Sequence, residues 1–186
     1  IRIGGFQEAY TNRILIAVSS GAVLTGSASF TFFQFQQDAP GPQPNSDNGA
    51  LADYATLGVD ANALYIGMNS FGSNGVFRGT TGFVVRKSAL LASPSSLVVT
   101  AFRQLAPASG PGVYTPQGVS NDDPAATAGY FIGVDNASLG LLVLRKITNP
   151  GATPSISGNI NVTVPTTTSP ISVPHPGSTC PLDALD

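Results

Sequence analysis

Residues 54–91 read YATLGVDANALYIGMNSFGSNGVFRGTTGFVVRKSALL, and residues 114–150 read YTPQGVSNDDPAATAGYFIGVDNASLGLLVLRKITNP. Both stretches alternate short apolar runs with turns rich in Gly, Ser or Asn. Four elements recur in the same order, namely Tyr54 as Tyr114, Gly58-Val59 as Gly118-Val119, Ile66-Gly67 as Ile132-Gly133, and Arg86-Lys87 as Arg145-Lys146. A self-similar period that contains strand-like segments is typical of modular β architectures. We therefore predict two equivalent modules, with the repeated residues at equivalent positions of successive sheets.

Each module contains four segments with strand character, rich in β-branched and aromatic residues and bounded by turn residues. In the first of the two they lie near residues 55–60, 63–70, 81–90 and 96–104, and in the second near 116–120, 128–135, 139–147 and 156–164. Four antiparallel strands every 50–60 residues are typical of β-propeller blades. A β-sandwich is the alternative, because sandwiches also contain many short strands with turn signals. The matched residue pairs favour the propeller.

The chain divides by composition into five segments. Two strand-like runs before residue 37 predict a partial first blade at 1–37, and three prolines and an Asn-Gly pair predict a loop at 38–53. The second blade is predicted at 54–105 and the third at 114–164. Prolines among Ser and Thr predict an extended connector to a further blade at 165–186. Because a propeller ring closes with roughly four to eight blades, three modules are expected to need further chain or identical neighbours.

The composition argues against helices. Charged residues make up 10% of the chain, against roughly 25% in ordinary soluble domains, while Gly and Pro number 21 and 15. Glu8 is the one glutamate and Lys87 and Lys146 are the two lysines, so strong helix formers are scarce on the surface. We predict an all-β chain with no helix longer than about one turn.

The charge pattern excludes some partners. The net charge is −2 and the chain has no basic stretch, so nucleic acid and anionic membrane surfaces are not expected to bind. No apolar run approaches the ~18 residues of a membrane-spanning helix. The sequence has no initiator Met and no signal peptide at its start, and Ile1-Arg2-Ile3 already resembles a strand. The chain is therefore expected to begin inside a larger protein.

The run from Asp53 to Ile66, DYATLGVDANALYI, resembles a segment of large secreted bacterial proteins of the β-propeller type. In these proteins a D-Y-P-x-L-G-V-D-x-x-A-L-Y run is followed by a V-L-R-K strand, and the tail HPGSTCPLDALD is similar to their connector into the next blade. The resemblance covers residues 10–186; it departs at Ala55, where the family has Pro, and in the absence of Trp. It implies a propeller fold, a secreted or cell-surface location and a longer polypeptide. It implies no particular activity.

Five aspartates lie near predicted strand ends and turns: Asp53, Asp60, Asp122, Asp123 and Asp135. Asp53, Asp60 and Asp135 are the candidates for a catalytic pair in glycoside hydrolysis, which needs two carboxylates ~5–9 Å apart. Asp122 and Asp123 are candidate Ca²⁺ ligands. The alternative is turn chemistry, in which Asp accepts hydrogen bonds from its own backbone. Because no D-x-D-x-D-G loop is present, no cofactor is expected, and Ca²⁺ stays an alternative.

The repeated basic residues also allow two interpretations. Arg86-Lys87 and Arg145-Lys146 could bind acidic glycans, or could bridge neighbouring blades by pairing with Asp or with carbonyl groups. The bridging role is favoured. Gly67 and Gly133, each in the middle of a strand, are expected to permit close packing between blades.

Three further features carry weaker expectations. His175 lies between prolines in the predicted connector, and no G-x-S-x-G elbow exists, so we expect a solvated linker residue. Cys180 is the one cysteine, which leaves a partner outside the chain or a free thiol. Asn136-Ala-Ser138 and Asn161-Val-Thr163 match the glycosylation sequon, which matters only in a eukaryotic host.

The sequence as a whole favours an extracellular structural or adhesive module of the propeller type, with a glycan or a cell-surface protein as candidate ligand. The alternative is a propeller-type glycoside hydrolase or lyase that acts on polysaccharide. Convergence of two Asp side chains on one pocket would favour the enzyme, and Asp residues scattered in turns would favour binding. No recognisable catalytic constellation is present, so the non-enzymatic interpretation is preferred.

Overall fold

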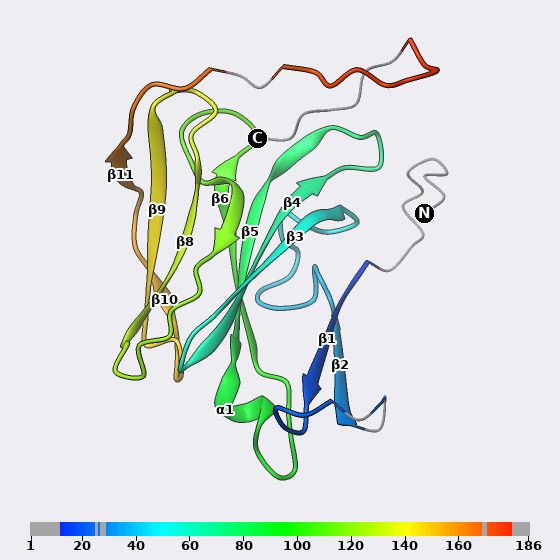
Figure 1. The fold of residues 1–186 in the computed structure, drawn as a ribbon, viewed down its shortest axis with the longest axis vertical. Coiled ribbons are helices and arrows are strands. Elements are labelled where there is room, and N and C mark those ends of the chain that lie inside the picture. The colour runs from blue at the N-terminus through cyan, green and yellow to red at the C-terminus, as the bar shows by residue number, and fades with distance from the viewer. Residues whose placement is uncertain (1–11, 25, 27–28, 169–170, 180–186) are drawn as a thin grey trace.

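The computed structural model describes residues 12–24, 26, 29–168 and 171–179. Within these residues the chain is built from antiparallel sheets, and its one helix, α1 (Lys87–Leu90), is a single turn. The expected all-β character is thereby confirmed. Figure 1 shows the sheets as layers, with the N-terminal strands on one side of the central strands and the C-terminal strands on the other.

The strands form three sheets that follow one another along the chain. The N-terminal hairpin pairs β1 (Arg13–Ser19) with β2 (Phe30–Gln36). The central sheet has the order β3 (Leu51–Val59), β4 (Ala63–Phe71), β5 (Phe77–Arg86), β6 (Val99–Pro107). The C-terminal sheet has the order β7 (Tyr114–Gly118), β8 (Ala128–Val134), β9 (Leu141–Thr148), with β10 (Ser155–Ile156) and β11 (Ile160–Thr163) both beside β9. Within each sheet, consecutive strands are neighbours, except that β11 pairs with β9 and not with β10.

Several boundaries differ from the sequence-based expectation; β6, for example, spans Val99–Pro107 where a strand was expected near 96–104. The Pro-rich loop ends at residue 50, because β3 already begins at Leu51. The strand expected over 81–90 ends at Arg86, and the next four residues form α1. The strand expected over 156–164 is broken: the Lys146 N–H donates to the Ser157 hydroxyl at 2.9 Å in place of a backbone carbonyl, and β11 resumes only at Ile160.

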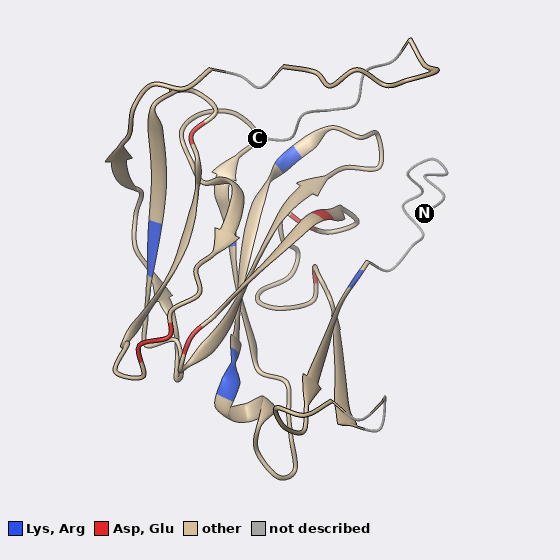
Figure 2. Ribbon diagram, viewed as in Figure 1, with Lys and Arg blue, Asp and Glu red and all other residues tan. Residues whose placement is uncertain are grey.

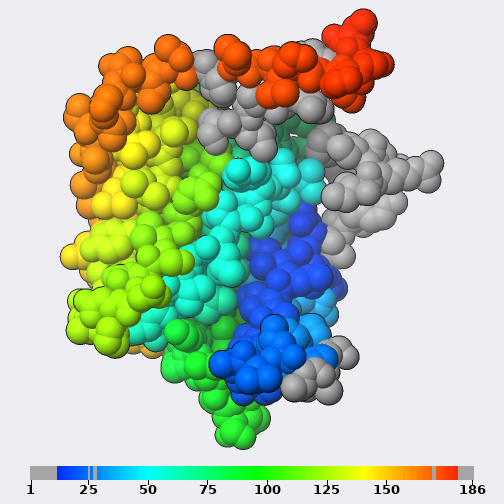
Figure 3. Space-filling view, in the orientation of Figure 1, coloured from blue at the N-terminus to red at the C-terminus, as the bar shows by residue number. Residues whose placement is uncertain are grey.

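Alternation along the central strands buries both faces of the central sheet. On β4 and β5, Tyr65 and Val84 face the C-terminal sheet, whereas Ile66 and Phe83 face the hairpin. Because successive side chains of a strand point to opposite faces, one apolar strand can serve two cores. In the space-filling view the blue hairpin and the yellow to orange C-terminal strands lie on opposite sides of the cyan and green central sheet (Figure 3).

Each interface has its own core. The core towards the C-terminal sheet contains Ala63, Tyr65, Val84, Leu105, Val113, Phe131, Val143 and Ile147. The core towards the hairpin contains Ile14, Ile16, Ile66, Met68, Phe83, Val85 and Leu90. Edge-to-face ring pairs lie in both, Tyr65 with Phe131 (centroids 6.0 Å apart) and Phe35 with Phe83 (5.2 Å). The three layers are thus joined by two continuous apolar interfaces.

Glycines bring the backbone of β7 into contact with β3 and β4 of the central sheet. A Cβ on Gly58 would lie 2.2 Å from the carbonyl carbon of Gly118, and a Cβ on Gly67 would lie 1.9 Å from the carbonyl oxygen of Pro116. Gly118 would in turn meet the carbonyl oxygen of Tyr65 at 2.1 Å. No side chain other than hydrogen fits at these three positions. The expected role of Gly67 in close packing between modules is therefore what the contacts show, whereas Gly133 lies against Tyr114 of its own sheet.

This contact is fastened by hydrogen bonds from side chains of the central sheet to the backbone of β7 and of the residue before it. The Thr56 hydroxyl donates to the Pro116 carbonyl at 2.7 Å and accepts from the N–H of Gly118 at 3.3 Å. The Thr80 hydroxyl donates to the Val113 carbonyl at 2.8 Å. β7 therefore runs diagonally from β5 to β3 across the central sheet.

A β-bulge in the first strand of each sheet fixes how the two modules correspond. In β3 the pairing shifts between Asp53 and Thr56, and in β7 it shifts between Tyr114 and Gln117. The first bulged residue has a left-handed backbone in both, with φ 54° at Tyr54 and 44° at Thr115. The bulges therefore align Tyr54 with Thr115, one residue away from the match with Tyr114 that the sequence suggests.

The repeat in the sequence is corrected accordingly. Gly58 pairs with Tyr65 across β3 and β4, and the equivalent cross-strand neighbours in the C-terminal sheet are Val119 and Tyr130, not Gly118 and Phe131. A shift of one residue moves a side chain to the opposite face of a sheet. The matched residues of the Gly-Val and Ile-Gly pairs thus lie on corresponding strands but on opposite faces. Tyr65 and Phe131, which precede the two Ile-Gly pairs, show this: they face each other across the interface and pack in one core.

The Arg-Lys pairs are displaced as well. Arg86 lies opposite Ala63 at the end of β5, whereas Arg145 lies opposite Phe131 in the middle of β9. The strand position that corresponds to Arg86 is held by Thr148, which is opposite Ala128. The match in sequence between the two arginines therefore does not extend to the structure.

We predict that Gly67→Ala destabilises the protein by about 1–3 kcal/mol or more, because the new methyl group overlaps the Pro116 carbonyl and forces the sheets apart. Urea denaturation followed by circular dichroism measures the change. Gly158→Ala is the matched control, since a Cβ there meets nothing within 4 Å. Equal stability of the two variants would show that the backbone contact does not hold the sheets together.

Candidate functional site

The structure places two of the candidate catalytic aspartates, Asp60 and Asp135, in turns between strands, and the third, Asp53, within β3. Asp60 lies between β3 and β4, where its Oδ1 accepts the backbone N–H groups of Asn62 and Ala63 at 2.7 and 2.9 Å. Its Oδ2 accepts the Tyr65 hydroxyl at 2.6 Å. The Lys87 ammonium group donates to the Asp60 carbonyl at 2.9 Å. Both carboxylate oxygens of this buried residue are therefore engaged by its own turn and strand.

Tyr65 responds to this environment. Its ring is fully buried. The pKa of Tyr65 is raised above the ordinary value of 10.0, first by burial, then by the hydrogen bond to the Asp60 carboxylate, and then by the negative charge of Asp60. A buried phenol that resists ionisation and donates to a neighbouring carboxylate acts as a structural hydrogen-bond donor. The pair closes the β3–β4 turn and supports the core between the sheets.

Asp135 repeats the turn role between β8 and β9, accepting the N–H of Ala137 at 2.8 Å. Burial and then the charge of Asp135 raise the pKa of Tyr114, whose hydroxyl donates to the carbonyl of Gly110 at 2.7 Å. Asp53 accepts the N–H of Tyr54 at 2.9 Å next to the bulge. Figure 2 shows acidic residues chiefly in turns and at strand ends, with few charges in between.

The candidate calcium ligands lie in the exposed segment between β7 and β8. Asp123 accepts the N–H of Ala125 at 2.9 Å, which is a turn bond, and Asp122 is exposed beside it. Among the described residues, no group of three or more His, Cys, Asp or Glu side chains is placed to hold a metal ion.

The two repeated arginines both lie partly inside the protein. Arg86 donates to the Ala152 carbonyl, which links the central sheet to the C-terminal sheet, as the bridging interpretation expects. Arg145 lies on the face of β9 that is turned towards the central sheet, and burial lowers its pKa. Lys146 is exposed on the opposite face, so Arg145 and Lys146 form no common binding surface.

The remaining candidates are peripheral. His175 is exposed, and its carbonyl accepts the Ser178 N–H at 3.1 Å in a turn. Asn136 and Asn161 are both exposed. Cys180 lies outside the described residues.

The structure contains a buried polar cluster that the sequence pattern did not indicate. Asp47, in the Pro-rich loop, forms an ion pair with Arg103 of β6 and accepts the Thr81 hydroxyl at 2.7 Å. Arg103 also donates to the Pro40 carbonyl at 2.7 Å, and Gln37 donates to the Ala50 carbonyl at 2.5 Å. The Asp47 side chain is 1% exposed and that of Arg103 12%. This cluster holds the loop against β5 and β6 and has a structural role. The sequence carried no signal for it, because Asp47 and Arg103 are far apart in the chain.

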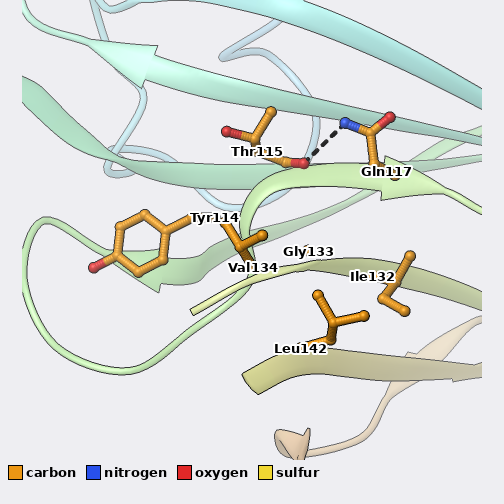
Figure 4. Close-up of a pocket in the computed structure, with 7 residues that line it drawn as sticks. All are labelled: Tyr114, Thr115, Gln117, Ile132, Gly133, Val134 and Leu142. Carbon is orange, nitrogen blue, oxygen red and sulfur yellow. Dashed lines mark hydrogen bonds between the residues drawn. The ribbon is translucent and has the colours of Figure 1, made fainter. Parts of the chain in front are cut away.

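A hollow lies on the outer face of the C-terminal sheet, over the bulge in β7. It is lined by Tyr114, Thr115, Gln117, Ile132, Gly133, Val134 and Leu142 and has a volume of about 170 Å³. Figure 4 shows Ile132 and Leu142 beside each other on neighbouring strands, with Gln117 bonded to the Thr115 carbonyl at 3.1 Å. The lining is mainly apolar and holds no carboxylate. None of the candidate aspartates lines it.

The chain matches no protein-family model, and neither a curated protein nor a solved structure is significantly similar to it. Among the described residues, no helix is long and apolar enough to cross a membrane.

We predict that Arg103→Met lowers the free energy of unfolding by about 3–5 kcal/mol, because it leaves the Asp47 carboxylate buried without its countercharge. Chemical denaturation measures the loss. Arg78→Met is the control: Arg78 donates to the Asn48 carbonyl of the same loop at an exposed position, and its loss is expected to cost about 0.5 kcal/mol or less. Adding Asp47→Asn to Arg103→Met is expected to restore part of the stability. Equal losses for the two single variants would contradict the role of the buried ion pair.

We also predict that stability falls at alkaline pH through Tyr65. Its pKa is raised in the folded state, so above about pH 10 the unfolded chain releases a proton that the folded chain retains. The free energy of unfolding then decreases by about 1.4 kcal/mol per pH unit for this one group. Tyr65→Phe is expected to remove that share of the slope between pH 9 and 11.5, whereas Tyr130→Phe, on the outer face, is expected to keep it. Denaturant titrations at each pH decide; parallel curves for the wild type and Tyr65→Phe would contradict the assignment.

Proposed function

We propose that this chain is a structural module of an extracellular β-propeller-type protein, formed by two complete blades and part of a preceding one. The observation that carries the proposal is the shared construction of the central and C-terminal sheets. Both are meanders whose first strand has a bulge, with a left-handed residue (Tyr54, Thr115) at the same place in the pairing. Two sheets built alike and stacked face to face are what repeated blades require.

The facing of equivalent residues supports a propeller over a sandwich. Ile66 of β4 faces the hairpin that precedes its sheet, and its equivalent Phe131 faces the central sheet that precedes its own. In both modules the equivalent face therefore packs on the sheet that precedes it in the chain. This is expected if each blade is related to the next by a rotation. The central sheet is also covered on both faces, whereas each sheet of a two-layer sandwich has one face in solvent.

The spacing of the sheets supports a ring as well. β7, the edge strand of the C-terminal sheet, touches the backbone of β3 and β4 at Gly58 and Gly67, while the rings of Tyr65 and Phe131 lie between β4 and β8. Sheets that are closer at one edge than at the other form a wedge. Wedges placed side by side turn about an axis near their narrow edges, which is the geometry of blades around a channel.

The carboxylates give the alternative enzyme no support. The side chains of Asp60 and Asp135 accept hydrogen bonds from their own turns, and the hollow over β7 has no acidic residue. The extracellular location is supported by the resemblance to secreted bacterial propeller proteins, and a glycan or cell-surface ligand would contact the exposed turns of such a scaffold.

Electron microscopy of the complete polypeptide tests the architecture. We expect class averages that show a disc with a central channel and radial blades. An elongated stack without a channel would contradict the propeller.

A panel of chromogenic glycosides, run beside a glycan array, tests the function. We expect no turnover above the buffer blank for the wild-type polypeptide. If the wild type turns over a glycoside and folded Asp53→Asn or Asp135→Asn does not, the protein is an enzyme and the proposal of a structural module is wrong.

A further inference from the structure

We propose that Asn48-Gly49, in the Pro-rich loop, is a self-modification site, where the Asp38 carboxylate promotes closure of the Asn48 side chain onto the backbone to form a succinimide. The chain contains two Asn-Gly pairs, Asn48-Gly49 and Asn74-Gly75, and both lie in turns. Such a pair is prone to this ring closure, because glycine has no side chain that obstructs the attack of its nitrogen. The two pairs differ in the groups that contact the reacting atoms, and this difference holds whether or not the sheets belong to a propeller.

The nucleophile of the reaction is the backbone nitrogen of Gly49. Its N–H donates to Oδ2 of Asp38 at 3.3 Å, so a carboxylate faces the proton that must leave. Asp38 is 8% exposed, and its Oδ1 accepts the Gln36 amide group at 2.6 Å, which fixes the orientation of the carboxylate. A base that is hydrogen-bonded to the transferred proton is the arrangement that general-base catalysis requires.

The electrophile is the side chain of Asn48, and both of its polar atoms are engaged. Its Oδ1 accepts the backbone N–H of Asn45, which polarises the carbonyl group and stabilises the negative charge that develops on this oxygen. Its Nδ2, the leaving group, donates to Oε1 of Gln43 at 3.1 Å. The attacking nitrogen, the carbonyl oxygen and the leaving amine thus each contact a group suited to the change in charge that the atom undergoes.

The loop holds these groups in place. The Asp38 carbonyl accepts the Gln43 amide group at 2.5 Å and the Asn45 amide group at 2.8 Å. On the other side of the reacting pair, Asp47 is buried and its carbonyl accepts the N–H of Ala50 at 2.9 Å. The base, the donor to the carbonyl oxygen and the acceptor for the leaving amine are therefore linked to one another before the reaction begins, as a preorganised site requires.

The reaction balances with water as its one co-reactant. Asp38 takes the proton of the Gly49 N–H while the nitrogen forms a bond to Cγ of Asn48. The bond from Cγ to Nδ2 then breaks, and the amine leaves as ammonia with the proton that Asp38 returns. Asn48 and Gly49 are exposed, and a Cβ on Gly49 would meet nothing within 4 Å, so water reaches the ring. Water opens the succinimide at either carbonyl and leaves aspartate or isoaspartate at position 48.

The second Asn-Gly pair has different partners. The Gly75 N–H donates to the Gly72 carbonyl at 2.8 Å, which is a neutral acceptor and not a base. The Asn74 Oδ1 accepts the N–H of Val76 at 3.1 Å, as in an ordinary Asx turn. Because neither of these partners is a carboxylate, Asn74-Gly75 is an internal control within the same chain.

The product alters the loop between its attachments. Isoaspartate lengthens the main chain by a carbon atom next to Asp47, which the ion pair with Arg103 holds in place. Either product also adds a negative charge to a loop that already contains the carboxylates of Asp38 and Asp47, and like charges repel. Modification therefore weakens the attachment of the loop to the central sheet, and the extent of the change increases with the age of the molecule.

Peptide mapping of the polypeptide by mass spectrometry tests the inference. The protein is incubated folded and in urea, and the product at each pair is measured as the exchange of an amide group for a hydroxyl group, with hydroxylamine used to trap the succinimide. In urea we expect similar rates at Asn48 and Asn74, because glycine follows both. In the folded protein we expect the rate at Asn48, relative to that at Asn74, to be about 100-fold higher than in urea.

Asp38→Asn removes the base and keeps the shape of the side chain, so the ratio of the Asn48 rate to the Asn74 rate is expected to fall to within about tenfold of its value in urea. Asp122→Asn, at an exposed position, is the matched control for charge and is expected to leave the ratio unchanged. The comparison of the folded wild type with urea decides the matter should Asp38→Asn fail to fold. A folded-state ratio equal to or below that in urea would overturn the inference, and so would an unchanged ratio in folded Asp38→Asn.

Discussion

The stack depends on the backbone contact between β7 and the central sheet. Where Gly58 meets Gly118 and Gly67 meets Pro116, the absence of side chains brings the sheets within hydrogen-bonding distance of each other. Thr56 then bonds both a carbonyl and an N–H of β7, and the Asn121 N–H donates to the Val59 carbonyl at 3.0 Å. Sheets that usually pack through side chains, about 10 Å apart, are here joined by polar bonds along β7, the edge strand of the C-terminal sheet. That edge sets the angle at which the rest of the apolar interface closes.

The few charged residues of this chain serve the same architecture. Asp60 organises the β3–β4 turn and orients Tyr65, while Asp47 and Arg103 hold the Pro-rich loop against the central sheet. Each of these groups is buried with its partners, so each specifies one arrangement of backbone, and removing one partner leaves the other desolvated. The chain has few charged residues, and the buried ones position the backbone. They therefore add little to the charge of the surface.

The sequence revealed the all-β character of the chain, because strand-forming runs bounded by Gly, Pro and Asn are local signals. It also indicated that Gly67 packs closely between modules. It misplaced the repeat by one residue, because Gly-Val and Ile-Gly pairs recur without regard to the bulges, and the left-handed backbone at Tyr54 and Thr115 has no marker such as glycine. The Asp47–Arg103 pair was invisible for a different reason: its partners are brought together only by the stacking of the loop on β6. The hollow over β7 likewise exists only as a relation between three strands.

The broken fourth strand of the C-terminal sheet has a consequence for solubility. A long unpaired strand at a sheet edge offers a row of free N–H and C=O groups that can recruit other chains into fibrils. Here the edge is divided into β10, of two residues, and β11, of four. Between them, the Ser157 hydroxyl accepts the N–H of Lys146. Neither piece is long enough to template an extended strand from another molecule. Edge-on aggregation is thereby disfavoured, and the C-terminal sheet is left to associate through its broad face.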